Sequence, residues 1–156
     1  MDMATPTDIS EPIIEALYTE ALVLADEARQ VFDLAPVDAH DPEADHVRLA
    51  LSVEGLRTTT RVMHVLAWLL NHRAYFKGEM TELQLRRHSK LPPDRESDRA
   101  NLAVLEYPTR ELIHDSERLH ARVARLDAAW RDGFEMRPSA VHRLRDRIDR
   151  SFAARG

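Results

Sequence analysis

The chain has 156 residues and a net charge of −5, and this length suits a single domain with a sizeable core. Hydrophobic residues make up 44% of it, aromatic residues only 6%, and there are four glycines, which favours helices packed through Leu, Val and Ala. The absence of cysteine excludes a disulfide framework and a thiolate metal site. The first residues have neither the basic flank nor the apolar run of a secretory signal, so we expect a cytoplasmic protein.

Charge is distributed unevenly along the chain. Residues 1–45 contain 12 acidic residues and one basic residue, Arg29, whereas the remainder contains 15 acidic and 21 basic residues. We favour an acidic first helix that packs on a more basic bundle, because charge runs usually line solvated faces. The alternative is a basic surface that binds an acidic partner.

The first predicted helix covers residues 10–35. Ser10 is suited to the N-cap, and Pro12 falls in the first turn. Apolar residues then recur at alternating steps of three and four, which is typical of a single packing face. They are Ile14, Leu17, Ala21, Leu24, Ala28 and Val31. Pro36 ends the pattern, and a polar loop follows.

The second predicted helix is the longest and covers residues 45–77. Its packing face repeats the same steps through Leu51, Gly55, Thr58, Val62, Val65, Leu69, His72 and Phe76. Gly55 and Thr58 are small, so they would let a neighbouring helix approach closely. Gly78 is suited to the C-cap, because glycine enters the left-handed region at little cost.

A short helix, a long helix and a tail helix are expected downstream. Thr81 and Gln84 have the capping-box spacing for a short helix over residues 81–88, and residues 89–99 are interpreted as a loop. The third long helix is predicted at residues 108–131, with Pro108 in its first turn and Gly133 as its stop. Its packing face is Leu112, Ser116, Leu119, Val123, Leu126 and Trp130. The tail helix would place Val141, Leu144, Ile148 and Phe152 on one face.

No segment shows strand-like alternation of useful length. The sequence therefore predicts an all-α fold, an antiparallel three-helix bundle with short extra helices and short connections. The expected organisation is a flexible N-terminus at residues 1–9, the helical domain at residues 10–135 and a basic tail or short helix at residues 136–156.

Residues 62–70 are apolar around nearly the whole circumference of the second helix. A membrane span needs roughly 20 such residues, so this stretch is too short for one. A helix in a three-helix bundle needs only one apolar stripe, so part of this surface is expected to contact another chain. Because twofold dimers dominate soluble oligomers, we predict a homodimer. The predicted interface residues are Val62, Val65, Leu66, Trp68 and Leu69.

The motifs with the residue types of catalytic or metal-binding sites are weak. Two Glu-x-x-His units, Glu111 with His114 and Glu117 with His120, have the spacing found in di-iron bundles. Such a site needs its units on different helices, whereas these lie on one helix and point about 240° apart. No zinc-protease motif, nucleophile elbow or glycine-rich phosphate loop is present. We expect no metal, no cofactor and no enzymatic activity.

The arginine-rich tail supplies the alternative function. Arg143, Arg145, Arg147, Arg150 and Arg155 cluster there, and clustered positive charge can bind the phosphates of nucleic acid. The alternative is therefore a nucleic-acid-associated regulatory dimer. Two aspartates interrupt the cluster and aromatic residues for base stacking are scarce, so we favour a solvated tail.

Two segments resemble one known family. TTRVMHVLAWLLNHRAYFKGEMT, residues 59–81, resembles the signature of the bacterial RcdA family, the regulators of CtrA degradation. LIHDSERLHARVARLD, residues 112–127, is similar to the last long helix of that family. The first segment matches at Thr59, Thr60, Arg61, Met63, Ala67, Trp68, Leu69, Leu70, Arg73, Ala74, Gly78, Glu79, Met80 and Thr81. The second matches at Leu112, Ser116, Leu119, Arg122, Val123, Leu126 and Asp127.

The resemblance implies a non-enzymatic adaptor that dimerises. Family members help to deliver cell-cycle regulators such as CtrA to the ClpXP protease, so the implied partners are the protease machinery and its cargo. Transient contacts usually involve polar and charged surfaces. The predicted partner-binding residues are therefore Arg61, Arg73 and Glu79, together with Arg143 and Arg147 of the tail.

Overall fold

The computed structural model describes residues 9–33, 42–135 and 140–154. Within these ranges every regular element is a helix, which confirms the all-α prediction. Three helices are long, and they are α1 (Glu11–Asp33), α2 (Pro42–Phe76) and α5 (Tyr107–Glu135). The others are α3 (Glu82–His88), α4 (Arg99–Ala103) and α6 (Ala140–Ala153). No helix of the described ranges is long and apolar enough to cross a membrane.

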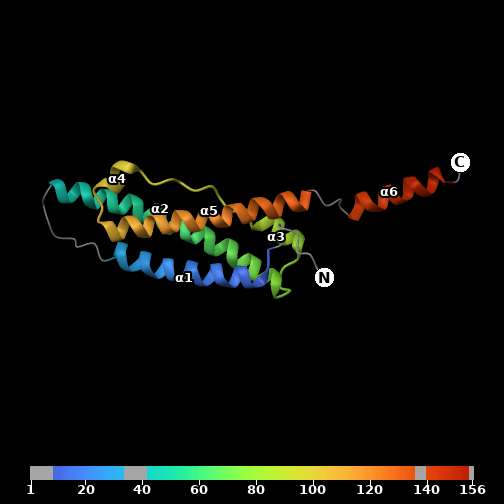
Figure 1. The fold of residues 1–156 in the computed structure, drawn as a ribbon, viewed down its shortest axis with the longest axis horizontal. Coiled ribbons are helices and arrows are strands. Elements are labelled where there is room, and N and C mark those ends of the chain that lie inside the picture. Colours follow the sequence, from blue (N-terminus) through green and yellow to red (C-terminus); the bar gives the residue numbers. More distant parts are fainter. Residues whose placement is uncertain (1–8, 34–41, 136–139, 155–156) are drawn as a thin grey trace.

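The long helices lie along one another (Figure 1), and most residues of their predicted packing faces are buried. Apart from Trp68, the core side chains of the long helices lie at the heptad-spaced positions. From α1 they are Ile14, Leu17, Ala21, Leu24 and Ala28; from α2, Val62, Val65, Trp68 and Leu69; from α5, Leu112, Leu119 and Val123. Burial of these residues confirms the periodicity of all three helices, since each contributes one stripe to a shared interior.

The direction of α5 differs from the prediction. α1 runs antiparallel to both other long helices, but α2 and α5 run parallel (Figure 1). Contacts between α2 and α5 follow this direction: Arg61 bonds to Ser116, and Trp68 bonds to Asp127. The expectation of an antiparallel bundle with short connections is therefore wrong for this pair, because the chain must return along the bundle before α5 begins.

Residues 89–98 make this return, and we refer to them as the strap. Ten extended residues reach about 33 Å, which is close to the length of α1 but shorter than α2 and α5. Six polar contacts hold the strap to α2 and α5 along its course. The backbone N–H of Leu91 donates to Asp127, Pro92 O bonds to His120, Asp94 and Arg95 O accept from Arg61, Ser97 donates to Glu117, and Asp98 N–H donates to Glu54. These contacts satisfy several backbone polar groups of the strap, which has no regular secondary structure.

The helix ends follow the cap signals in most places. Gly78 has φ +76°, and the N–H groups of Gly78 and Glu79 donate to Tyr75 O and Ala74 O, which is the Schellman arrangement. Thr81 and Gln84 make both hydrogen bonds of a capping box at α3. Both predictions are confirmed.

Two local predictions fail. Gly133 does not stop α5, which continues to Glu135, because glycine weakens a helix by only about 1 kcal/mol and does not break it. The region interpreted as a loop contains the start of α4, whose N-cap Asp98 accepts from Ala100 N–H. Five residues are too few for periodicity to reveal such a helix.

Gly55 permits a close contact between α1 and α2, as its size suggested. A Cβ at this position would lie 2.8 Å from Cδ1 of Phe32. The expected flexible N-terminus falls almost wholly on residues outside the described ranges, as do residues 136–139 of the tail.

Candidate functional site

The predicted interface residues lie in the core of their own chain. Val62, Val65, Trp68 and Leu69 are at most 3% exposed, and Leu66 is half-buried against the same core. A second chain cannot contact the four buried side chains while this fold persists. The dimer itself stays a prediction, and its contact must involve other side chains of α2.

Four of the exposed apolar side chains of α2 lie in one row. Leu49, Leu56, Met63 and Leu70 are between 48% and 71% exposed, and they recur every seven residues. We refer to them as the α2 row. Smaller exposed residues lie between them, namely Ser52, Thr59, Thr60 and Ala67. A heptad-spaced apolar row with small neighbours is the kind of surface on which a second helix packs.

Arg61 is a buried structural residue. It is 1% exposed, and its Nε lies 2.7 and 2.8 Å from the two carboxylate oxygens of Asp94. Its other nitrogens donate to Ser116 Oγ at 2.9 Å and to Arg95 O at 3.0 Å. Every partner belongs to α5 or the strap, so Arg61 is not placed to bind another protein, contrary to the prediction.

Arg73 links α2 to α1. Its Nε donates to Glu15 at 2.8 Å, and its guanidinium lies 4.1 Å from the centre of the Tyr18 ring. The hydrogen bond to Glu15 raises the pKa of Arg73 above its usual value. Together with the ion pair between Arg122 of α5 and Glu20, this contact supports an acidic α1 packed on basic neighbours.

The remaining predicted partner-binding residues are at the surface or outside the described residues. Glu79 is exposed at the turn after Gly78, and Arg147 is exposed on α6. The side chain of Arg143 lies outside the described residues.

A buried polar cluster joins α2, α5 and the strap around Asp127. Its carboxylate accepts from Trp68 Nε1 at 3.0 Å, from Leu91 N–H at 3.3 Å and from Arg131. His72 stacks on Trp68 with ring centres 3.8 Å apart. Burial lowers the pKa of His72 from 6.5 to about 4, with Asp127 opposing this shift and Arg131 adding to it.

The two Glu-x-x-His units do not form a shared site. His114 lies 3.6 Å from Glu117 of the same helix, whereas His120 bonds to Pro92 O of the strap. Within the part of the chain that the structure describes, no group of three potential ligands is placed to hold a metal ion.

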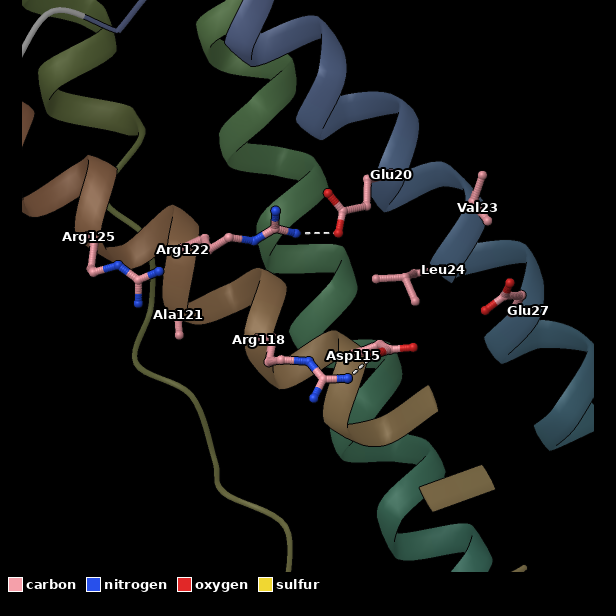
Figure 2. A pocket seen from close by; sticks show the side chains of 9 residues that line it. All are labelled: Glu20, Val23, Leu24, Glu27, Asp115, Arg118, Ala121, Arg122 and Arg125. Carbon is pink, nitrogen blue, oxygen red and sulfur yellow. Dashed lines mark hydrogen bonds and ion pairs between the residues drawn. The ribbon is translucent and has the colours of Figure 1, made fainter. Parts of the chain in front are cut away.

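An open groove of about 660 Å³ runs between α1 and α5. Figure 2 shows Glu20, Leu24 and Glu27 of α1 facing the arginines of α5 across it. Arg122 pairs with Glu20, and Arg118 pairs with Asp115. The groove therefore has an acidic wall, a basic wall whose charge is partly neutralised, and an apolar floor.

One of the comparisons with known proteins gives a match. The model of the family described as "Protein of unknown function (DUF1465)" matches residues 6–152. The chain belongs to the DUF1465 family. No curated protein and no solved structure matches it.

The features of this DUF1465 protein that sequence reasoning missed are the α2 row, the strap contacts and the groove. The α2 row has a visible signal, since its four members repeat at seven residues. The signal was hidden because the whole circumference of residues 62–70 is apolar, and only the packed structure separates the inner stripe from the outer one.

Proposed function

We propose that the protein is a non-enzymatic, cytoplasmic adaptor. It acts as a homodimer with a three-helix bundle as its scaffold, and it helps to deliver cell-cycle regulators of the CtrA type to the ClpXP protease. The observation that carries the proposal is the α2 row, because a large exposed apolar surface on a helix marks a protein-interaction site. The class of partner comes from the resemblance of residues 59–81 to the RcdA family.

The α2 row suits pairing with a second copy in the antiparallel direction. From Leu49 to Leu70 it spans about 32 Å of helix. A twofold axis between Leu56 and Met63 would pair Leu49 with Leu70 of the second copy, and Leu56 with its Met63. The same arrangement brings exposed Asp45 at one end of α2 toward exposed Lys77 beyond the other end. Charge at the two ends is thus complementary in this direction.

Exposed charged groups outside the α2 row are the candidates for contact with the protease and its cargo. Glu79 is the strongest candidate, since it is exposed and its backbone is fixed by the Schellman turn. Arg73 is a weaker candidate because its side chain already bonds to Glu15. An adaptor of this kind acts by raising the effective concentration of cargo at the protease, so it needs binding surfaces and no reaction chemistry.

Light scattering of the purified protein tests the dimer. The double variant Leu56→Lys with Met63→Lys is expected to convert a dimer into a monomer without loss of helicity, since four buried charges per dimer would oppose association. Leu83→Lys is the control, because Leu83 is similarly exposed but lies on α3. A monomeric unmodified protein, or a double variant that remains dimeric, would show that the α2 row is not the contact.

A degradation assay with purified ClpXP and a CtrA-type response regulator tests the function. The protein is expected to accelerate loss of the regulator, and Glu79→Arg is expected to slow it. Glu96→Arg, at another exposed acidic position, should behave as the unmodified protein does. No acceleration by the folded dimer would refute the adaptor proposal. Binding to DNA with a steep dependence on salt would instead support the nucleic-acid alternative.

A further inference from the structure

α6 has an apolar face with no other helix beside it in Figure 1. Leu144, Ile148 and Phe152 recur every four residues and are 58%, 46% and 74% exposed. An isolated helix of 14 residues is marginal in water, and helices in proteins gain most of their stability by burying one face. α6 therefore needs a surface that covers these three side chains.

The α1–α5 groove is a suitable surface. Ala121 lines it, and Ala128, one heptad further along α5, is also exposed. On α1, Ile13 and Ala16 are exposed on the same side of the helix as Glu20. These apolar side chains extend the surface beside the charged walls of the groove, whereas α2 and the strap cover other sides of α5.

Figure 1 shows α6 beyond the end of α5. We propose that α6 folds back from there and docks its apolar face into the α1–α5 groove of its own chain, as a fourth helix antiparallel to α5. Four residues separate Glu135 from Ala140, and connections of this length commonly join antiparallel helices. In the docked position α6 runs back along α5 for about 21 Å. Phe152 then lies level with residues 121–125, at the near end of the groove.

The opposite charges of α6 and α1 also favour docking of α6 in the α1–α5 groove. The described side chains of α6 include Arg145, Arg147 and Arg150 but one acidic residue, Asp149, whereas α1 carries six acidic residues and one arginine. With the apolar face in the groove, the right-handed turn of α6 places Arg145 on the edge that faces α1. Arg145 is then level with the first turns of α1, where Glu11 and Glu15 lie. A basic helix thus lies beside an acidic one.

Cross-linking tests the docked position directly, because the chain contains no cysteine. Ala121→Cys with Ser151→Cys places one thiol on the groove and one on the edge of α6 that faces α5. A short bis-maleimide is expected to join the two within one chain, giving a product of monomer mass and one joined peptide pair by mass spectrometry. The control is Ala121→Cys with Arg150→Cys, which places the second thiol on the opposite face of α6.

The control pair should give a several-fold lower yield. Equal yields from the two pairs, or no product from the first, would overturn the proposal. A product of dimer mass would show that a second copy occupies the groove, and this result also contradicts docking within one chain.

Hydrogen exchange gives a second, independent measurement. Leu144→Asp with Phe152→Asp should increase the exchange rate of α6 amides about tenfold or more, because an undocked helix opens freely. Leu83→Asp on α3 is the matched control and should leave α6 unchanged. If α6 of the unmodified chain already exchanges as fast as in the double variant, α6 is not docked.

Discussion

Replacing Arg61 by methionine is expected to destabilise the fold strongly. The side chain is fully buried, and methionine fills similar space without any hydrogen-bond donor. The substitution removes the donor from Asp94, Ser116 and Arg95 O at once. It therefore detaches the middle of the strap from α2 and α5.

The size of the loss in the free energy of unfolding depends on how far the hydrogen-bond partners of Arg61 are exposed. Breaking a fully buried charge pair costs about 3–5 kcal/mol. Asp94 is 19% exposed, so water can solvate part of its carboxylate, and Ser116 still donates to Ile113 O. We therefore expect a loss of about 2–3 kcal/mol in the free energy of unfolding. In urea this corresponds to a midpoint lower by about 1 M.

Urea denaturation followed by far-UV circular dichroism measures this loss. Arg73→Met is the matched control, since it removes the same residue type from the same helix. Its ion pair with Glu15 is partly exposed to solvent, so its midpoint should move much less than that of Arg61→Met. Limited trypsin digestion adds a local readout, because Lys90 and Arg95 lie in the strap and should be cut faster in Arg61→Met. Equal midpoint shifts for the two variants would refute the assignment of Arg61 as the anchor of the strap.

Two further predictions concern single residues of α2 and its end. Gly78→Ala should lower the free energy of unfolding by about 1 kcal/mol in the same urea assay, since φ +76° strains any Cβ and no atom within 4 Å compensates; an unchanged midpoint would contradict this. For His72, whose pKa falls from 6.5 to about 4, the unfolded chain binds a proton that the folded chain excludes. The stability that His72 contributes is therefore present above pH 6.5 and should decrease by about 3 kcal/mol as pH falls to 4. His72→Phe should lack this component, which is measured as the pH-dependent difference between the two proteins; parallel pH profiles would show that His72 titrates alike in both states.

The inner faces of the long helices could be predicted because their signal is local. Heptad spacing within α1, α2 and α5 requires no knowledge of the rest of the chain, and the cap residues Gly78 and Thr81 act within one turn. The capping box and the glycine turn were accordingly found at the right positions. A periodic pattern says nothing about helix direction, however, and so the parallel course of α5 was missed.

The strap could not be predicted because its contacts join distant residues. Arg61 and Asp94 are separated by 33 positions, and Glu54 and Asp98 by 44. Neither pair has a spacing that a local pattern can reveal. An arginine beside an apolar stretch was therefore interpreted as a surface group, although it is one of the most buried side chains in the described ranges.

The burial of Arg61 changes what the resemblance to the RcdA family supports. Many of the matching residues have internal roles: Trp68 donates to Asp127, Ser116 accepts from Arg61, and Gly78 forms the turn after α2. Matching residues at these interior positions bear on the fold, because those residues determine how α2, α5 and the strap pack. Partners are recognised by exposed groups, and a related protein with the same interior can carry a different surface. Substitutions of Leu56, Met63 and Glu79 therefore test the adaptor proposal. A substitution of Arg61 alone would report on folding.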